Sequence, residues 1–173
     1  MSVQGARIDP LKSYNFLVTL VDSTDALTTS LGAIQSVAVG GFSECSGLEM
    51  QLETERRQEG GNNATMRNFP TRVTWSNLRL KRGVTVAEDL WNWHYAFVEG
   101  RGRRRDGIVV LQNDLHVPLK AWHFRRALPV KWTGPTFNAM RAEVAVEELE
   151  IMHEGLELFA PGTALAALGS LSS

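Results

Sequence analysis

The stretch YNFLVTLV, at residues 14–21, introduces the pattern that dominates this 173-residue chain. It is rich in aromatic and β-branched residues and follows Pro10, so it predicts a β-strand near the N-terminus. Further along, residues 108–115 and 119–128 predict a β-hairpin in which Trp122 and Phe124 share one face. The chain therefore reads as mainly β.

Other segments show the same alternation of apolar and polar residues. We expect further strands at residues 34–45, 48–55, 72–81 and 141–154. In 48–55, apolar residues alternate with an acidic row, which predicts a half-buried strand. The alternation changes parity near Ser76–Asn77 and again near Glu147–Glu148, which predicts a β-bulge at each place. Residues 129–135 predict an irregular crossing anchored by Trp132.

One segment has helical periodicity instead. Thr85 and Glu88 have the spacing of a capping box, and Gly100 is a suitable helix stop. The apolar residues that recur at helical spacing between them are Val86, Leu90, Trp93 and Phe97. We expect one flanking α-helix at about residues 85–99 against a small β-barrel or sandwich of about seven strands.

The length fits a single domain over residues 1–173, with a core at about 10–156. Residues 54–70 mix charges, Gly-Gly, Asn-Asn and a final proline, so they predict an extended loop. A loop of this length in a compact domain is usually functional or disordered. Residues 157–173 predict a C-terminal tail rich in small residues.

The composition excludes several classes of function. Lys and Arg number 18 against 19 Asp and Glu, and the net charge of −1 argues against a nucleic-acid binder but does not oppose self-association. Cys45 is the only cysteine, which excludes an internal disulfide framework and a thiolate zinc cluster. No apolar run is long enough to cross a bilayer. The N-terminus has no secretory signal pattern, so we expect synthesis in the cytoplasm.

No constellation of residues predicts catalysis. The sequence lacks a nucleophile elbow and a phosphate-binding glycine loop, and its histidines are far apart. Glu143 and Glu147 lie in a carboxylate-rich segment whose alternation favours exposed strand faces over an acid–base pair. We therefore expect no catalytic, cofactor-binding or metal-binding residue, and no cofactor.

Charge clusters are the strongest remaining feature. The basic run contains Arg101, Arg103, Arg104 and Arg105. We expect this run to pair with an acidic row on a neighbouring copy, such as Glu49, Glu53 and Glu55. A solvated turn is the simpler alternative. A domain with these features is more typical of a protein that assembles with other copies than of an enzyme.

In this context the sequence resembles the inner-tube proteins of contractile injection systems and contractile phage tails. The resemblance covers roughly residues 10–156 and rests on several motifs in order. These are YNF (14–16), GFSECSGLE (41–49), EGGN (59–62), LRLKRG (78–83), LWNW (90–93), RRDG (104–107), ALPVKWTGP (127–135) and VEELE (146–150).

The resemblance implies a small β-barrel with a flanking helix, hexameric rings, and stacking of the rings into a hollow tube that carries cargo. It implies as partners a contractile sheath, a baseplate and spike, a tube initiator, a tube-terminator cap and cargo in the bore. It implies no membrane insertion by the subunit and no sequence-specific nucleic-acid binding. The subunit would be made in the bacterial cytoplasm and act in an extracellular or cell-associated particle or a virion tail.

On this basis the residues 54–70 become a clamp between copies. The expected contact residues are Glu55, Arg56, Arg57, Glu59, Gly60, Gly61, Asn62, Asn63, Arg103, Arg104 and Arg105, and the expected polar lumen or interface face is Glu49, Gln51 and Glu53. Alternatives are a type VI secretion tube protein, which shares the fold, or a monomeric β-barrel that binds a ligand or is an enzyme using Glu143 or Glu147. The sequence does not decide between phage tail and headless particle, or the cargo.

Overall fold

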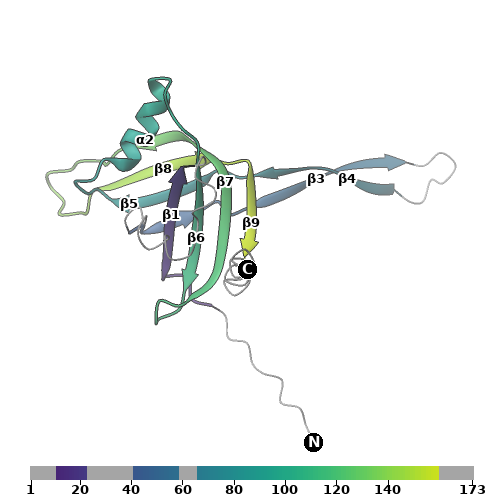
Figure 1. The fold of residues 1–173 in the computed structure, drawn as a ribbon, viewed down its shortest axis with the longest axis horizontal. Helices are drawn as coiled ribbons and strands as arrows, with labels where there is room; N and C mark the ends of the chain where they lie inside the picture. Colours follow the sequence, from purple (N-terminus) through teal and green to yellow (C-terminus); the bar gives the residue numbers. More distant parts are fainter. Residues whose placement is uncertain (1–10, 23–40, 59–65, 160–173) are drawn as a thin grey trace, which may run out of the picture.

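The computed structural model describes residues 11–22, 41–58 and 66–159. Its described part contains nine strands and one helix (Figure 1). The elements are β1 (Phe16–Asp22), β2 (Glu44–Ser46), β3 (Met50–Gln58), β4 (Met66–Trp75), β5 (Leu78–Gly83), α2 (Asp89–Val98), β6 (Arg105–Gln112), β7 (Pro118–Thr133), β8 (Val146–Met152) and β9 (Gly155–Phe159). Among the described residues, no helix combines the length and apolar content needed to cross a membrane.

The long strand β7 joins two antiparallel sheet regions. Its first half pairs with β6 and β9, and β6 pairs in turn with β1. Its second half pairs with β8, which leads on to β5 and β2. We call these the β1 sheet and the β5 sheet. In Figure 1 the strands of the β1 sheet cross those of the β5 sheet, and β7 curves from one into the other.

A local irregularity lets β7 change sheets. Arg126 has a φ of 52°, and the pairing with β8 shifts register between Pro129 and Lys131. The Arg126 backbone N–H donates to Asp106 Oδ1 at 2.7 Å, and its guanidinium Nε lies 2.7 Å from Glu154 Oε2. These contacts hold the left-handed residue in place, and a strand that bends in this way is the usual corner of an orthogonal sheet packing.

The core lies between the two sheets and under the helix. Leu78, Leu80, Leu149 and Ile151 of the β5 sheet are fully buried, as is Phe124 of β7. From the other side the core receives Val18 and Leu20 of β1, Val109 of β6, and Leu90 and Trp93 of α2. Burial of each such side chain contributes about 1.5–3 kcal/mol, so this cluster accounts for the attachment of both sheets and the helix.

The fold class predicted from the sequence is confirmed: the described part of the protein is mainly β with one flanking helix. The barrel, however, is open. Within the described residues, β1, β2 and β9 each pair with one neighbouring strand only, so each leaves one backbone edge unpaired. Unpaired edges invite pairing with another chain.

The largest correction concerns the extended loop predicted at 54–70. Residues 54–58 belong to β3 and residues 66–70 to β4, and the two strands form a separate two-stranded sheet. This hairpin projects away from the body (Figure 1). These strands look like a loop in the sequence because both faces of a projecting hairpin are open to water. Neither face has to be apolar, so the strands need no alternation of apolar and polar residues.

Three other boundaries also differ from prediction. The strand expected at 72–81 is two strands separated at Ser76–Asn77, and the irregular crossing expected at 129–135 is largely the continuation of β7. The first residues of the expected tail form β9, which pairs with β7. Of the strand expected at 34–45, residues 34–40 lie outside the described residues and 44–45 belong to β2.

The capping box is wrong as well. The helix begins at Asp89, its N-cap Glu88 makes no side-chain capping hydrogen bond, and Val86 is fully exposed. Thr85 Oγ1 instead accepts a hydrogen bond from the Ala87 N–H at 3.3 Å. The start of the helix is held by the ion pair between Asp89 and Arg82 of β5 in place of a local cap.

The bulge expected at Glu147–Glu148 does not occur, because β8 pairs with β5 in unbroken register from Val146 to Ile151. Glu147 faces the core together with Leu149 and Ile151. The apparent change of parity came from placing Val144 and Val146 on the core face, although these side chains are 81% and 41% exposed.

Gly107 provides a test of the packing between β1, β6 and β7. A Cβ at this position would lie 2.2 Å from Phe124 Cζ and 2.7 Å from the Thr19 carbonyl oxygen. We predict that Gly107→Ala lowers the free energy of unfolding by about 1–3 kcal/mol, measured by urea denaturation. Gly41→Ala is the matched control, because a Cβ there meets nothing within 4 Å. Equal stability of the two variants would contradict this packing.

Candidate assembly surfaces and the network that supports them

The β3–β4 hairpin presents an uncovered apolar face near its base. Met50 lies opposite Trp75, and Leu52 opposite Val73. Residues two apart on a strand share a face, so the four side chains form one row. Their exposed fractions are 64%, 38%, 55% and 42%, in the order Met50, Trp75, Leu52, Val73. The half-buried strand predicted for 48–55 is therefore wrong for the isolated chain, and this row is a surface that a partner can cover.

Within the described residues, the acidic residues of the hairpin and its base already have partners in the same chain. Arg72 Nε lies 2.6 Å from Glu53 Oε2, and Arg57 Nε lies 3.3 Å from Glu55 Oε1. Glu49 accepts a hydrogen bond from Ser76 Oγ at 3.0 Å. Gln51 is exposed.

Arg56 differs from these residues. It is exposed and forms no ion pair within the part of the chain that the structure describes. The hairpin therefore offers a free guanidinium more readily than a free acidic row. The other expected clamp residues, Glu59, Gly60, Gly61, Asn62 and Asn63, lie outside the described residues.

The arginine run is tied to the connection between α2 and β6. Arg104 Nη1 lies 2.8 Å from Glu154 Oε1 and also donates to the Arg126 carbonyl at 3.0 Å. The Arg105 guanidinium lies 5.1 Å from the centre of the Trp93 ring. The Arg103 carbonyl accepts a hydrogen bond from Trp93 Nε1 at 2.9 Å. The structure thus gives the run an internal packing role, with contacts to Trp93, Arg126 and Glu154.

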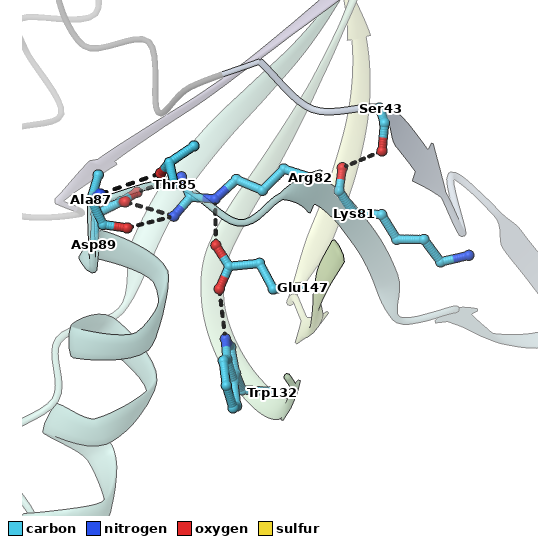
Figure 2. Close-up of polar contacts among 8 residues, drawn as sticks. All are labelled: Ser43, Lys81, Arg82, Thr85, Ala87, Asp89, Trp132 and Glu147. Carbon is cyan, nitrogen blue, oxygen red and sulfur yellow. Dashed lines mark hydrogen bonds and ion pairs between the residues drawn. The ribbon is translucent and has the colours of Figure 1, made fainter. Parts of the chain in front are cut away.

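A buried ionic network connects β5 and β8 with the start of α2 (Figure 2). Arg82 of β5 is 2% exposed and Glu147 of β8 is 6% exposed. Arg82 Nε donates to Glu147 Oε1 at 2.7 Å, and the other carboxylate oxygen accepts from Trp132 Nε1 at 3.0 Å. Arg82 Nη2 also donates to Asp89 Oδ1 at 2.8 Å and to the Ala87 carbonyl at 3.3 Å.

The network connects the helix to three positions in the β5 sheet. Asp89 is in the first turn of α2, where a carboxylate is also favoured by the positive end of the helix dipole. Burial alone would lower the pKa of Arg82, but hydrogen bonds and charges from Asp89 and Glu147 outweigh it and hold the pKa above its ordinary value. Arg82 stays charged, and its two carboxylate partners compensate that charge.

The sequence predicts no role for Arg82 or Asp89, and it predicts an exposed strand face for Glu147, which is in fact 6% exposed. The strand pattern did indicate that Arg82 is buried. Arg82 follows Leu78 and Leu80 at a spacing of two residues, so all three lie on the core face of β5. Glu147 is held by Arg82 and Trp132, so the carboxylate has a structural task. Glu143 is exposed and lies 3.6 Å from Arg141.

The remaining chemistry-bearing groups form no reactive arrangement. Burial, and to a smaller degree the charge of Glu44, raises the pKa of the Cys45 thiol to about 11, so the thiolate is scarce at neutral pH. A cleft of about 510 Å³ is lined by Cys45, Phe16, Leu48, Trp122 and the exposed Tyr14, among others. Within the described ranges, no three His, Cys, Asp or Glu residues are grouped so that they could hold a metal ion.

His153 lies where the hairpin meets the core. It is 6% exposed, its ring centre is 6.5 Å from that of Trp75 and 6.3 Å from that of Phe124, and its Nδ1 donates to the Gly155 carbonyl at 3.1 Å. Burial lowers the pKa of His153 and outweighs the opposite effect of the backbone of Gly155 and Ser76. Burial likewise lowers the pKa of His123, against the charges of Asp106 and Glu157.

Comparisons with known proteins agree with this architecture. The family model described as T4-like virus tail tube protein gp19 matches residues 12–157. No curated protein sequence matches the chain. The family match confirms the resemblance to tube proteins that the sequence motifs predicted.

Several solved structures have the same fold. A chain of the anti-feeding prophage (AFP) baseplate is 24% identical with a TM-score of 0.75, covering 89% of this chain and 98% of that one. A chain of the extended sheath–tube complex of the PVC extracellular contractile injection system is 24% identical with a TM-score of 0.72, covering 87% and 92%. An Hcp protein is 10% identical with a TM-score of 0.51, covering 86% and 94%.

The ionic network predicts an asymmetric mutational response. Replacement of Arg82 by methionine leaves Glu147 buried without its cation, so we expect a loss of about 3–5 kcal/mol in the free energy of unfolding by urea denaturation. The double variant Arg82→Met with Glu147→Met should recover part of that loss. Lys81→Met is the control on the same strand, because its pair with Glu44 is solvent-exposed and should contribute much less. Similar losses in Arg82→Met and Lys81→Met would contradict the network.

The buried histidines predict the direction of pH dependence. The unfolded chain takes up protons near pH 6.5 and the folded chain at a lower pH, so their contribution to stability is full above pH 6.5 and declines as the pH falls through and below that value. The urea midpoint should therefore be lower at pH 5.5 than at pH 7.5. His153→Gln should reduce this difference, whereas the exposed variant His116→Asn should preserve it. An unchanged pH difference in His153→Gln would exclude His153 as a source.

Proposed function

The chain belongs to the T4-like virus tail tube protein gp19 family, and on that premise we propose that it is the subunit of the rigid inner tube of a contractile injection system or phage tail. Membership makes it a structural tube protein, not an enzyme. The proposal goes further: copies form hexameric rings, the rings stack into a hollow conduit, and sheath contraction drives that conduit into a target.

The observation that carries the proposal is the incompleteness of the single chain. The edges of β1, β2 and β9 each lack a second strand within the described residues. An open sheet edge exposes backbone donors and acceptors, and pairing with a neighbouring copy satisfies them. Cyclic repetition of one head-to-tail contact closes a ring, and axial repetition of another leaves growing ends. The net charge of −1 gives little repulsion between copies.

The hairpin supplies the second part of the argument. Its apolar row of Met50, Leu52, Val73 and Trp75 is exposed in the single chain. The exposed Arg56, which has no ion pair within the described residues, lies further along β3. We propose that the hairpin lies against a neighbouring copy, with the apolar row buried and Arg56 paired to a carboxylate of that copy. The expected contribution of Glu59, Gly60, Gly61, Asn62 and Asn63 at the tip, and of Arg57 and Glu55 beside Arg56, belongs to the same proposal.

The proposed partners follow from the tube function. A sheath would surround the tube, a baseplate with spike and initiator would start it, a terminator cap would end it, and cargo would occupy the bore. Assembly in the bacterial cytoplasm and action in an extracellular particle or virion tail complete the proposal. The AFP and PVC likenesses support an injection particle, because those chains come from a baseplate and a sheath–tube complex.

Tube formation by the purified chain tests the proposal. We expect rings or tubes of uniform diameter in negative-stain electron microscopy and a pelleting fraction in sedimentation. In Arg56→Glu, the chain should fold with an unchanged thermal midpoint, but the concentration needed for tubes should rise about tenfold or more, since loss of an interfacial charge pair costs 2 kcal/mol or more.

Arg141→Glu is the matched control, because it reverses an exposed arginine whose partner, Glu143, is within the same loop. A wild-type chain that stays monomeric at every concentration would overturn the tube function. If tubes form equally well in Arg56→Glu and Arg141→Glu, the proposed tube function stands but the hairpin contact at Arg56 is excluded.

A further inference from the structure

The outer face of the β5 sheet carries a ladder of opposite charges. Core-facing and outward-facing residues alternate along each strand, so the outward positions can be read from the register. The outward residues are Glu44 and Ser46 of β2, Arg79 and Lys81 of β5, Glu148 and Glu150 of β8, and Lys131 and Thr133 of β7.

These residues fall into two rows across the sheet. In one row Ser46 is followed by Arg79, Glu150 and Lys131, and in the other Glu44 is followed by Lys81, Glu148 and Thr133. Cations and carboxylates therefore lie directly opposite each other on adjacent strands, which is the favourable cross-strand arrangement.

The side-chain contacts agree with the register. Lys81 Nζ lies 3.0 Å from Glu44 Oε2 and 3.8 Å from Glu148 Oε2. Asn77 Nδ2 donates to Glu150 Oε1 at 2.8 Å. Arg79, Lys81 and Lys131 balance Glu44, Glu148 and Glu150, so the ladder has no net charge.

The corresponding face of the β1 sheet has a different character. Thr19, Val110 and Ala121 point away from the core between the sheets, yet they are only 1%, 2% and 8% exposed. Leu17 and Ile108 lie on the same face. The outward face of the β1 sheet carries an exposed ion pair at its β7–β9 edge, where Arg125 Nη2 lies 2.9 Å from Glu157 Oε1. Only the outward face of the β5 sheet has charged residues on all four of its strands.

We propose that the charged ladder of the β5 sheet lines the bore of the tube. This assignment rests on the proposed tube function and names the wall that cargo meets. A wall of balanced, mutually paired charges stays hydrated and holds neither polyanions nor polycations by net attraction, since such retention requires an excess of one sign. It fits a conduit through which a polar cargo slides without adhesion.

Cysteine labelling of assembled tubes tests the assignment. Arg79→Cys and Lys131→Cys each report on the ladder, and Asn92→Cys on the exposed face of α2 is the control. The native Cys45 thiol, partly buried and with its raised pKa, gives a low background that the wild-type chain measures. Each variant is treated with a small maleimide and with a maleimide attached to a folded protein too wide for the bore.

In the unassembled chain, both reagents should label all three variants. In tubes, the small maleimide should still label Arg79→Cys and Lys131→Cys, whereas the protein-sized reagent should label them no faster than wild type. Asn92→Cys should react with both reagents in tubes.

Two results would overturn the assignment while leaving the tube function intact. Labelling of the ladder variants in tubes by the protein-sized reagent, as fast as Asn92→Cys, would put the ladder on the outside. Protection of both ladder variants from the small maleimide would put it in an interface between copies. Failure of the wild-type chain to form tubes would instead overturn the proposed function and, with it, the assignment.

Discussion

Arg82 and Glu147 face each other inside a sheet that is otherwise filled with leucine and isoleucine, and the architecture is arranged around the need to compensate these two charges. A buried ion that loses its partner is far more costly than an exposed one, so the pair fixes the register of β5 against β8. Asp89 extends the constraint to the first turn of α2, and Trp132 extends it to the second half of β7. One guanidinium thus relates the helix, the bent strand and the β5 sheet to each other.

With the centre fixed in this way, the periphery is left open. The β5 sheet ends at β2, the β1 sheet ends at β1 and β9, and the β3–β4 hairpin stands apart from both within the described residues. Met50, Leu52, Val73 and Trp75 are exposed on that hairpin without an intrachain reason. A rigid centre with unsatisfied edges suits a subunit whose remaining contacts come from copies of itself, because a rigid body loses little conformational freedom on assembly. Membership of the tail tube protein family and the unpaired sheet edges therefore support the same conclusion.

Much of the architecture was predictable from local pattern. Strands β1, β6 and β7 and the existence of one helix follow from β-branched and aromatic runs and from helical spacing around Leu90 and Trp93. The errors share one cause, which is that patterning assumes that apolar residues are buried and polar residues face water. Val144 and Val146 are exposed and Glu147 faces the core, so this segment seemed to change parity. The hairpin is exposed on both faces, so its strands seemed to be a loop. Of the candidate assembly residues, Arg56 was recognised as exposed charge, whereas the apolar row was misassigned as buried.

The sequence by itself determined the fold class, the helix that includes Leu90 and Trp93 and, through an ordered set of motifs, the tube family. These depend on periodicity and composition, which are local properties of the chain. Only the tertiary structure decided which carboxylate is buried, where β7 changes sheets, which edges stay open and that the β5 sheet carries a neutral charge ladder. Each of these depends on pairing between residues far apart in the chain, such as Arg82 with Glu147, and no local pattern records which distant partner compensates a charge or completes a sheet.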